Sequence, residues 1–159
     1  MDGCRRLGSS PYETQMSRER SSWDDVWMDV AHAIAKRSYD DRFQVGCVVV
    51  TVDNTAALAV GYNGNFKGGP HEPESTDPGK SGFIHAENNC LIKCPHHYPV
   101  DKKMYVTLSP CKQCAKLIVN GGIKHVIYDE EYRDTSGLHI LRDSGITVHK
   151  LSDLKQVSG

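Results

Sequence analysis

The sequence predicts an α/β domain in which helices cover both faces of a central mixed sheet. Segments whose apolar residues recur with helical spacing alternate with runs rich in β-branched residues, in the order αββαβαβαβ. The chain has 159 residues, 38% of them hydrophobic and 25% charged, which suits one domain with one core. We expect a five-stranded domain over residues 22–153, preceded by a disordered leader (1–21) and followed by a short tail (154–159).

The first half of the chain predicts one helix and two strands. A serine N-cap and early acidic residues open a helix within residues 21–38. Its expected core-facing residues are Trp23, Trp27, Val30 and Ile34. A β-branched run at 43–52 predicts a buried strand, and the turn at 53–54 leads into a second strand at 56–64.

The second half predicts a long loop and then alternating helices and strands. Residues 64–84 are rich in Gly, Pro and charge, and a loop this long is more often functional than idle. A short helix at 85–94 ends before Pro95. Another helix at 109–122 has Ser109 as its expected N-cap and Pro110 at its first position. The remaining elements are strands at 103–108, 124–129 and 146–151 and a helix at 135–145.

The composition limits the cellular location and the binding partners that we expect for this chain. The formal net charge of -1 argues against a protein that holds long nucleic acid by charge. No apolar run reaches the roughly 18 residues that a membrane-spanning helix needs. The six cysteines, without a secretory signal, indicate reduced thiols or metal ligands, so we expect a cytoplasmic protein.

Four residues form a candidate metal centre. Cys111 and Cys114 lie three positions apart at a helix start, which places both thiols on one face and favours the thiolate. Taken alone, this pair could equally be a redox pair or two core cysteines. His85 and Glu87 can share one site only if His85 lies at the start of its helix. Two thiolates and one imidazole would leave the fourth position of a zinc ion for water, and H-x-E…P-C-x-x-C is a signature of zinc base deaminases.

The resemblance extends beyond this signature. "GYNG", "HAENN", "MYVTLSPCKQCAKLIVNGGIKHVIYDEEY" and the closing "ITV" are similar to the deoxycytidylate deaminase family over about residues 22–151. The resemblance implies a three-layer α/β/α cytidine-deaminase-like fold and zinc-dependent hydrolysis of dCMP to dUMP and ammonia, which feeds thymidylate synthesis. It implies that one Zn²⁺ is held by His85, Cys111 and Cys114. Glu87 would move protons from the attacking water to N3 and to the departing amine.

Candidate substrate residues each have a simpler interpretation. In similar deaminases an Asn at position 63 hydrogen-bonds the sugar, although Asn63 also suits a turn. Ile84 could form an apolar wall beneath the base or belong to the core. Tyr132 follows a strand end near the expected nucleotide, or simply packs. The phosphate needs a cation or backbone donors, and the sequence does not choose among the candidates Arg42, Lys67, Arg133 and His71.

The loop after "GYNG" resembles the segment through which many family members sense dCTP as activator and dTTP as inhibitor, with Mg²⁺ accompanying the nucleotide. The candidate effector residues are Gly64, Lys67, Gly68 and His71. The resemblance also implies a homo-oligomer, often a hexamer.

Three other hypotheses remain. The chain could be another zinc deaminase, acting on free cytosine, cytidine or tRNA adenosine, or a structural zinc module without activity. A second zinc held by Cys90, Cys94, His96 and His97 is disfavoured, because adjacent histidines after a helix are more often solvated. Cys90 is expected to be a small buried residue on the inward face of its helix.

Overall fold

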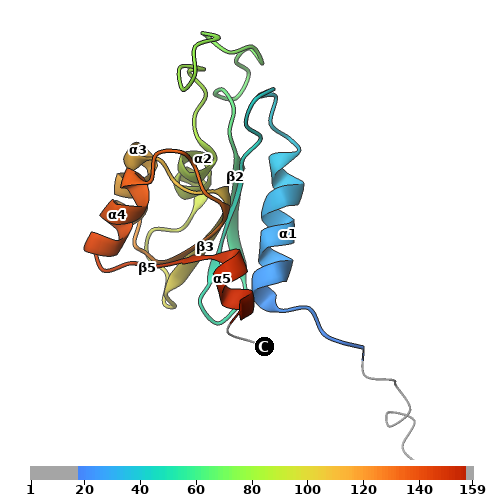
Figure 1. Cartoon of the computed structure of the whole chain (residues 1–159), viewed down its shortest axis with the longest axis vertical. Coiled ribbons are helices and arrows are strands. Elements are labelled where there is room, and N and C mark those ends of the chain that lie inside the picture. Colours follow the sequence, from blue (N-terminus) through green and yellow to red (C-terminus); the bar gives the residue numbers. More distant parts are fainter. Residues whose placement is uncertain (1–17, 157–159) are drawn as a thin grey trace, which may run out of the picture.

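A computed structural model describes residues 18–156, which fold into three layers, with a mixed five-stranded sheet between two layers of helices (Figure 1). The predicted α/β/α architecture is therefore confirmed. Residues 1–17 of the expected leader and residues 157–159 of the expected tail lie outside the described range. Within that range, no helix combines the length and the apolar character needed to cross a membrane.

The sheet has the strand order β2-β1-β3-β4-β5. β1 runs antiparallel to both of its neighbours, whereas β3, β4 and β5 are mutually parallel. Parallel neighbours need crossover connections, and helices α3 and α4 supply them. The strands are β1 (Gly46–Thr51), β2 (Ala57–Tyr62), β3 (Lys102–Leu108), β4 (Ile123–Glu130) and β5 (Thr147–Lys150).

Each face of the sheet has its own core. The larger core lies beneath α2 (Ala86–Lys93), α3 (Lys112–Asn120) and α4 (Ser136–Asp143). The smaller core lies beneath α1 (Trp23–Ala35) and α5 (Leu151–Gln156). The central strands β1 and β3 are buried along nearly their whole length, as expected for strands covered on both faces.

Helix α1 packs on the sheet through smaller residues than the sequence predicted. Its buried residues are Met28, Ala31 and Ala35, whereas Trp23 is 52% exposed. The reason is a close approach to β1: a Cβ atom on Gly46 would lie only 1.8 Å from the carbonyl oxygen of Ala31. Bulky side chains cannot occupy that contact. Trp27 and Val30 pack beside it as partly buried residues of the smaller core, as expected, and the exposed Trp23 stacks on Trp27.

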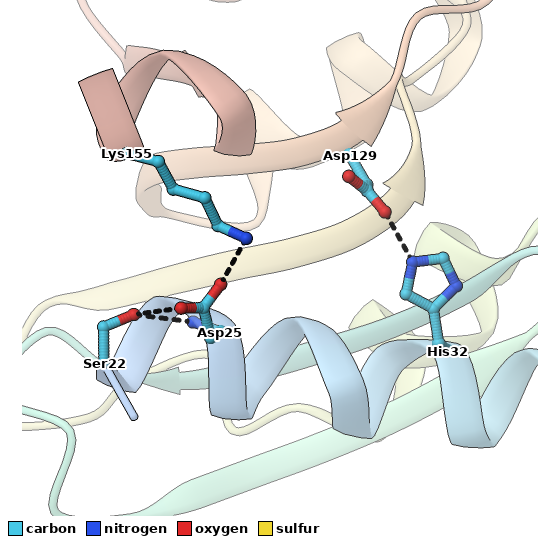
Figure 2. A network of polar contacts seen from close by, with 5 residues as sticks. All are labelled: Ser22, Asp25, His32, Asp129 and Lys155. Carbon is cyan, nitrogen blue, oxygen red and sulfur yellow. Dashed lines mark hydrogen bonds and ion pairs between the residues drawn. The ribbon is translucent and has the colours of Figure 1, made fainter. Parts of the chain in front are cut away.

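Polar contacts at both ends of α1 attach it to helix α5 and to strand β4 (Figure 2). At the start of the helix, Ser22 Oγ accepts from the backbone N–H of Asp25, and the Asp25 carboxylate lies 2.9 Å from Nζ of Lys155 on α5. Near its end, Nε2 of His32 lies 2.6 Å from a carboxylate oxygen of Asp129 on β4.

Helix α5 differs from the expected strand up to residue 151 and tail from residue 154. β5 ends at Lys150, and Leu151 starts a helix that continues to Gln156. Leu151 and Leu154 pack against the smaller core, so the folded domain extends beyond the expected boundary at residue 153.

Candidate active site

The N-terminal ends of α2 and α3 meet at one point on the larger-core side of the sheet. His85 is the N-cap of α2, the placement that the spacing of His85 and Glu87 required. Cys111 is the N-cap of α3, and Cys114 lies in the first turn of that helix. The expected N-cap Ser109 is wrong, because α3 begins two residues later than predicted, at Lys112. The hydroxyl of Ser109 instead accepts from the backbone N–H of Tyr132 at 2.7 Å.

The three candidate metal ligands form one compact group. Nδ1 of His85 lies 3.3 Å from Sγ of Cys114 and 3.4 Å from Sγ of Cys111, and all three ligand atoms lie within 4.8 Å of one another. Zinc–sulfur and zinc–nitrogen bonds of about 2.3 and 2.0 Å place tetrahedral ligand atoms at roughly these separations. Among residues 18–156 no other His, Cys, Asp or Glu belongs to this group, so the donor set suits a metal with one open position.

The pKa values of the two thiols in this group are shifted in opposite directions. A hydrogen bond from Cys114, together with a smaller effect of His85, lowers the pKa of Cys111 to about 4. The same contact raises the pKa of Cys114, and burial raises it again. A hydrogen bond to Cys111 raises the pKa of His85. The group therefore holds a thiolate at neutral pH, which is the form of cysteine that binds metal.

Glu87 lies in the first turn of α2 and is 4% exposed. Burial is the main cause that raises the pKa of its carboxyl group. Glu87, His85 and Cys111 all line one cavity of about 580 Å³. The arrangement thus places a buried carboxyl group and a metal-binding group on the wall of a cavity large enough for a small organic molecule.

Two glycines allow β2 and α4 to pack closely against the backbone segments that carry the candidate ligands. A Cβ atom on Gly61 of β2 would lie 2.4 Å from the carbonyl oxygen of Ala86 on α2. A Cβ atom on Gly137 of α4 would lie 2.1 Å from the carbonyl oxygen of Pro110, just before Cys111. The backbone segments that carry the ligands are therefore packed directly against β2 and α4.

Of the predicted substrate residues, Asn63, Tyr132 and Arg42 line the cavity. Ile84 is not a lining residue, and its backbone instead pairs with that of Gly64. Its neighbour Phe83 takes the place on the cavity wall. Lys67 and Arg133 are likewise absent from the lining, and the Arg133 guanidinium lies 5.6 Å from the ring centroid of Tyr132.

Asn63 is 6% exposed, and each of its polar atoms is paired with the segment 38–45. Its side-chain Oδ1 accepts from Val45 N at 2.9 Å, and Nδ2 donates to the Phe43 carbonyl at 2.7 Å and to Asp40 Oδ2 at 3.4 Å. Its backbone N–H donates to the Val45 carbonyl, and its carbonyl accepts from Ser38 Oγ. Asn63 therefore combines a structural role with a position on the cavity wall.

Sequence reasoning missed other lining residues. Phe43, which is 51% exposed, packs edge-on against Tyr132 with ring centroids 6.2 Å apart. Asp40 and Lys112 also line the cavity. The position of Lys112 beside the ligand Cys111 was a usable signal, whereas nothing periodic in the sequence distinguishes Asp40 or Phe43.

The predicted effector residues lie outside this cavity. Gly64, Lys67, Gly68 and His71 belong to the loop before α2, where His71 stacks on Tyr39 with ring centroids 4.0 Å apart. Gly68 has a φ of 85°, a conformation that favours glycine. Cys90 is fully buried, as expected. Within residues 18–156, Cys90, Cys94, His96 and His97 do not form a metal-binding group.

Comparison with known proteins agrees with this geometry. The family model described as "Cytidine and deoxycytidylate deaminase zinc-binding region" matches residues 21–130. The ComE operon protein 2 of Bacillus subtilis is 35% identical over 84% of this chain and 73% of its own length. A probable deoxycytidylate deaminase of Drosophila melanogaster is 34% identical over 84% of this chain and 71% of its own.

Among solved structures, the dCMP deaminase of cyanophage S-TIM5 in complex with dCMP and dUMP is 31% identical, with a TM-score of 0.73. The match covers 84% of this chain and 99% of the phage protein. The family match, the identities and the His85–Cys111–Cys114 group together show that this chain belongs to the cytidine and deoxycytidylate deaminase family.

Proposed function

We propose that the protein is a zinc-dependent deaminase that hydrolyses dCMP to dUMP and ammonia. The observation that carries this proposal is the group of His85, Cys111 and Cys114, of which His85 and Cys111 line one cavity together with the buried Glu87. The similarity to proteins named deoxycytidylate deaminases supports dCMP as the substrate.

In this proposal His85, Cys111 and Cys114 hold Zn²⁺. The ion would supply Lewis acidity, which lowers the pKa of water at its open position. Glu87 would accept the proton that water releases as its oxygen attacks C4 of the base. The same carboxyl group would then donate that proton to N3, accept the second proton from the new C4–OH group and pass it to the amino group, so that the C4–N bond breaks, C4 becomes a carbonyl and ammonia leaves. The burial of Glu87 keeps bulk water from competing for that proton.

The residues around Asn63 suggest how the nucleotide is held. Both N–H groups of the Asn63 amide are already used, but Oδ1 has a second lone pair. We propose that this oxygen accepts from a sugar hydroxyl, while Tyr132 contacts the nucleotide and Arg42 pairs with the phosphate. A guanidinium group suits a phosphate because it donates two parallel hydrogen bonds.

The proposal extends to regulation, assembly and location. The exposed loop of residues 64–84 is the candidate site for dCTP and dTTP with Mg²⁺, and a homo-oligomer in the cytoplasm is the expected form of the protein. Reduced cysteines support the location, since Cys47, Cys90, Cys94, Cys111 and Cys114 are all free thiols. Saturation curves for dCMP with and without each effector nucleotide test the regulation.

Ammonia release from dCMP, dCTP, deoxycytidine, cytosine and tRNA tests the proposed activity. We expect turnover with dCMP, and a Glu87→Gln variant that keeps about one zinc per chain but loses at least about 10³-fold in kcat, because proton transfer is removed and the ligands are not. Turnover of tRNA or cytosine in preference to dCMP would favour another deaminase. Zinc binding without turnover of any substrate would favour a structural module.

A further inference from the structure

The carboxylate of Asp40 joins two parts of the cavity wall. Oδ1 accepts from the backbone N–H groups of Arg42 at 2.8 Å and of Phe43 at 3.1 Å. The other oxygen, Oδ2, accepts from Nδ2 of Asn63 at 3.4 Å. One side chain thus connects the segment that carries Arg42 and Phe43 to the end of β2, and all four residues line the cavity.

The same contacts fix which way the Asn63 amide faces. The Val45 N–H can only donate and the Phe43 carbonyl can only accept, so Oδ1 must face Val45 and Nδ2 must face Phe43. The second N–H of that amide donates to Oδ2 of Asp40. Because both N–H groups are used, the amide presents only an acceptor to a ligand.

We propose that Asp40 is a positioning residue for the nucleotide site, which sets the Asn63 acceptor and the Arg42–Phe43 segment in one fixed relation. This inference rests on the proposed function, because it assigns the positioned groups to a nucleotide. Asp40 touches no reacting atom. It acts through Asn63, Arg42 and Phe43, and it therefore affects how the substrate binds more than how it reacts.

The role needs a carboxylate and not merely a polar side chain. An amide at position 40 has one oxygen and one NH₂ group. If its oxygen faces the N–H groups of Arg42 and Phe43, its NH₂ meets the NH₂ of Asn63. If the amide is reversed, its NH₂ meets the two backbone N–H groups. Asp40→Asn therefore loses one side of the connection at almost unchanged volume.

An ordinary loop role for Asp40 makes a different prediction. Aspartates often accept backbone N–H groups within a turn, which orders the turn and nothing else. In that case Asp40→Asn would lower stability, and would change kcat and KM together or not at all. A positioning role predicts a selective rise in KM, since weaker binding of substrate and transition state alike raises KM and leaves kcat unchanged.

The matched control is Asp29→Asn, which removes the same charge from an exposed side chain on α1 that does not line the cavity. We expect Asp40→Asn to raise KM for dCMP at least about tenfold with kcat within about threefold of the wild type, which is the effect of losing one or two hydrogen bonds to a charged group. Asp29→Asn should change KM by less than about threefold. The zinc content should stay the same in both variants.

Hydrogen exchange tests the positioning separately from activity. In Asp40→Asn the backbone amides of residues 42–45 should exchange at least about tenfold faster than in the wild type and in Asp29→Asn. If the wild type deaminates no cytosine nucleotide, the proposed function fails, and this exchange difference still decides whether Asp40 holds the segment. Equal exchange in the two variants, or equal KM values for dCMP, overturns the proposal.

A longer acid gives a second comparison. Asp40→Glu keeps a carboxylate that can accept on both oxygens, so its KM should lie between those of the wild type and Asp40→Asn. If Asp40→Asn does not fold, comparing Asp40→Glu with Asp29→Glu makes the same test. A KM that is the same in these two variants would contradict the assignment.

Discussion

Nδ1 of His85 lies 3.3 Å from Sγ of Cys114, although the two residues are 29 positions apart in the chain. The two residues belong to different helices, so their proximity requires that α2 and α3 both be packed in place on the sheet. A metal ion that binds this group therefore binds the folded chain far more tightly than the unfolded chain. Metal binding and folding should consequently be linked.

Replacing Cys114 by serine tests that link. The variant should retain less than about 0.1 zinc per chain, and its thermal unfolding midpoint should fall by several degrees, because the stabilisation from bound metal is lost. Elemental analysis and calorimetry measure the two effects. Cys94→Ser is the matched control, since Cys94 lies outside the ligand group. A full zinc content in Cys114→Ser, or an equal loss of zinc in the control, would contradict the assignment of ligands.

The Gly61 contact predicts a steric effect on stability. In Gly61→Ala the new Cβ atom would meet the Ala86 carbonyl oxygen at 2.4 Å and the Cys90 nitrogen at 2.5 Å, and neither backbone atom can move away alone. We expect the free energy of unfolding to fall by about 1–3 kcal/mol, as in overpacked cores. Urea unfolding measures it. Gly64→Ala, whose Cβ atom would lie 3.7 Å from its nearest neighbour in the Tyr62 ring, should change it by less than about 1 kcal/mol.

Lys102 connects the far ends of the two helices that carry the metal ligands. Its buried Nζ donates to the carbonyl groups of Pro95 at 2.8 Å, Gly121 at 3.1 Å and His96 at 3.2 Å. In Lys102→Met these carbonyls lose their donor, and we expect a loss of about 3 kcal/mol in the free energy of unfolding. The exposed Lys116→Met on α3 provides the control. If urea unfolding gives equal values for both variants, the three contacts do not stabilise the fold.

Local sequence patterns predicted the elements other than α5 and the candidate ligand group, but not the contacts between elements. Runs of β-branched residues in the sequence predicted the strands. The spacing of His85 and Glu87 correctly predicted where α2 begins. Ser109 and Pro110 also looked like a helix start, but the Ser109 hydroxyl accepts instead from Tyr132 N, 23 positions away in the chain. Tertiary contact outweighed the local capping preference there.

The small residues at the closest contact of α1 and the connection of Asp40 to Asn63 were not predictable, because both depend on a distant part of the chain. The helix approaches Gly46 so closely that small residues are needed, and this requirement lies in β1 and not in the helix. Asp40 and Asn63 are 23 positions apart and belong to no periodic pattern. Such hydrogen bonds depend on where the folded chain brings the two segments together, so single-sequence patterns do not reveal them.

His125 predicts a dependence of stability on acid pH. Burial lowers the pKa of this histidine, and the nearby His149 and Lys103 lower it further. Its Nε2 atom is buried and has no hydrogen-bond partner within the described part of the chain. In the unfolded chain a histidine titrates near pH 6.5, at about the usual value. As the pH falls through that value, the unfolded chain therefore takes up a proton that the folded chain resists.

The free energy of unfolding should accordingly fall between about pH 7.5 and 5.5, and His125→Gln should lose less of it over the same range because the titrating group is gone. Urea unfolding at several pH values measures this difference. The exposed His139 on α4 provides a control, and His139→Gln should follow the wild type. If the curves for His125→Gln and the wild type stay parallel, another group causes the acid sensitivity. If the two curves converge as the pH falls, His125 on β4 is the cause. A histidine whose pKa is depressed in the folded state makes the free energy of unfolding fall as the pH falls through that range.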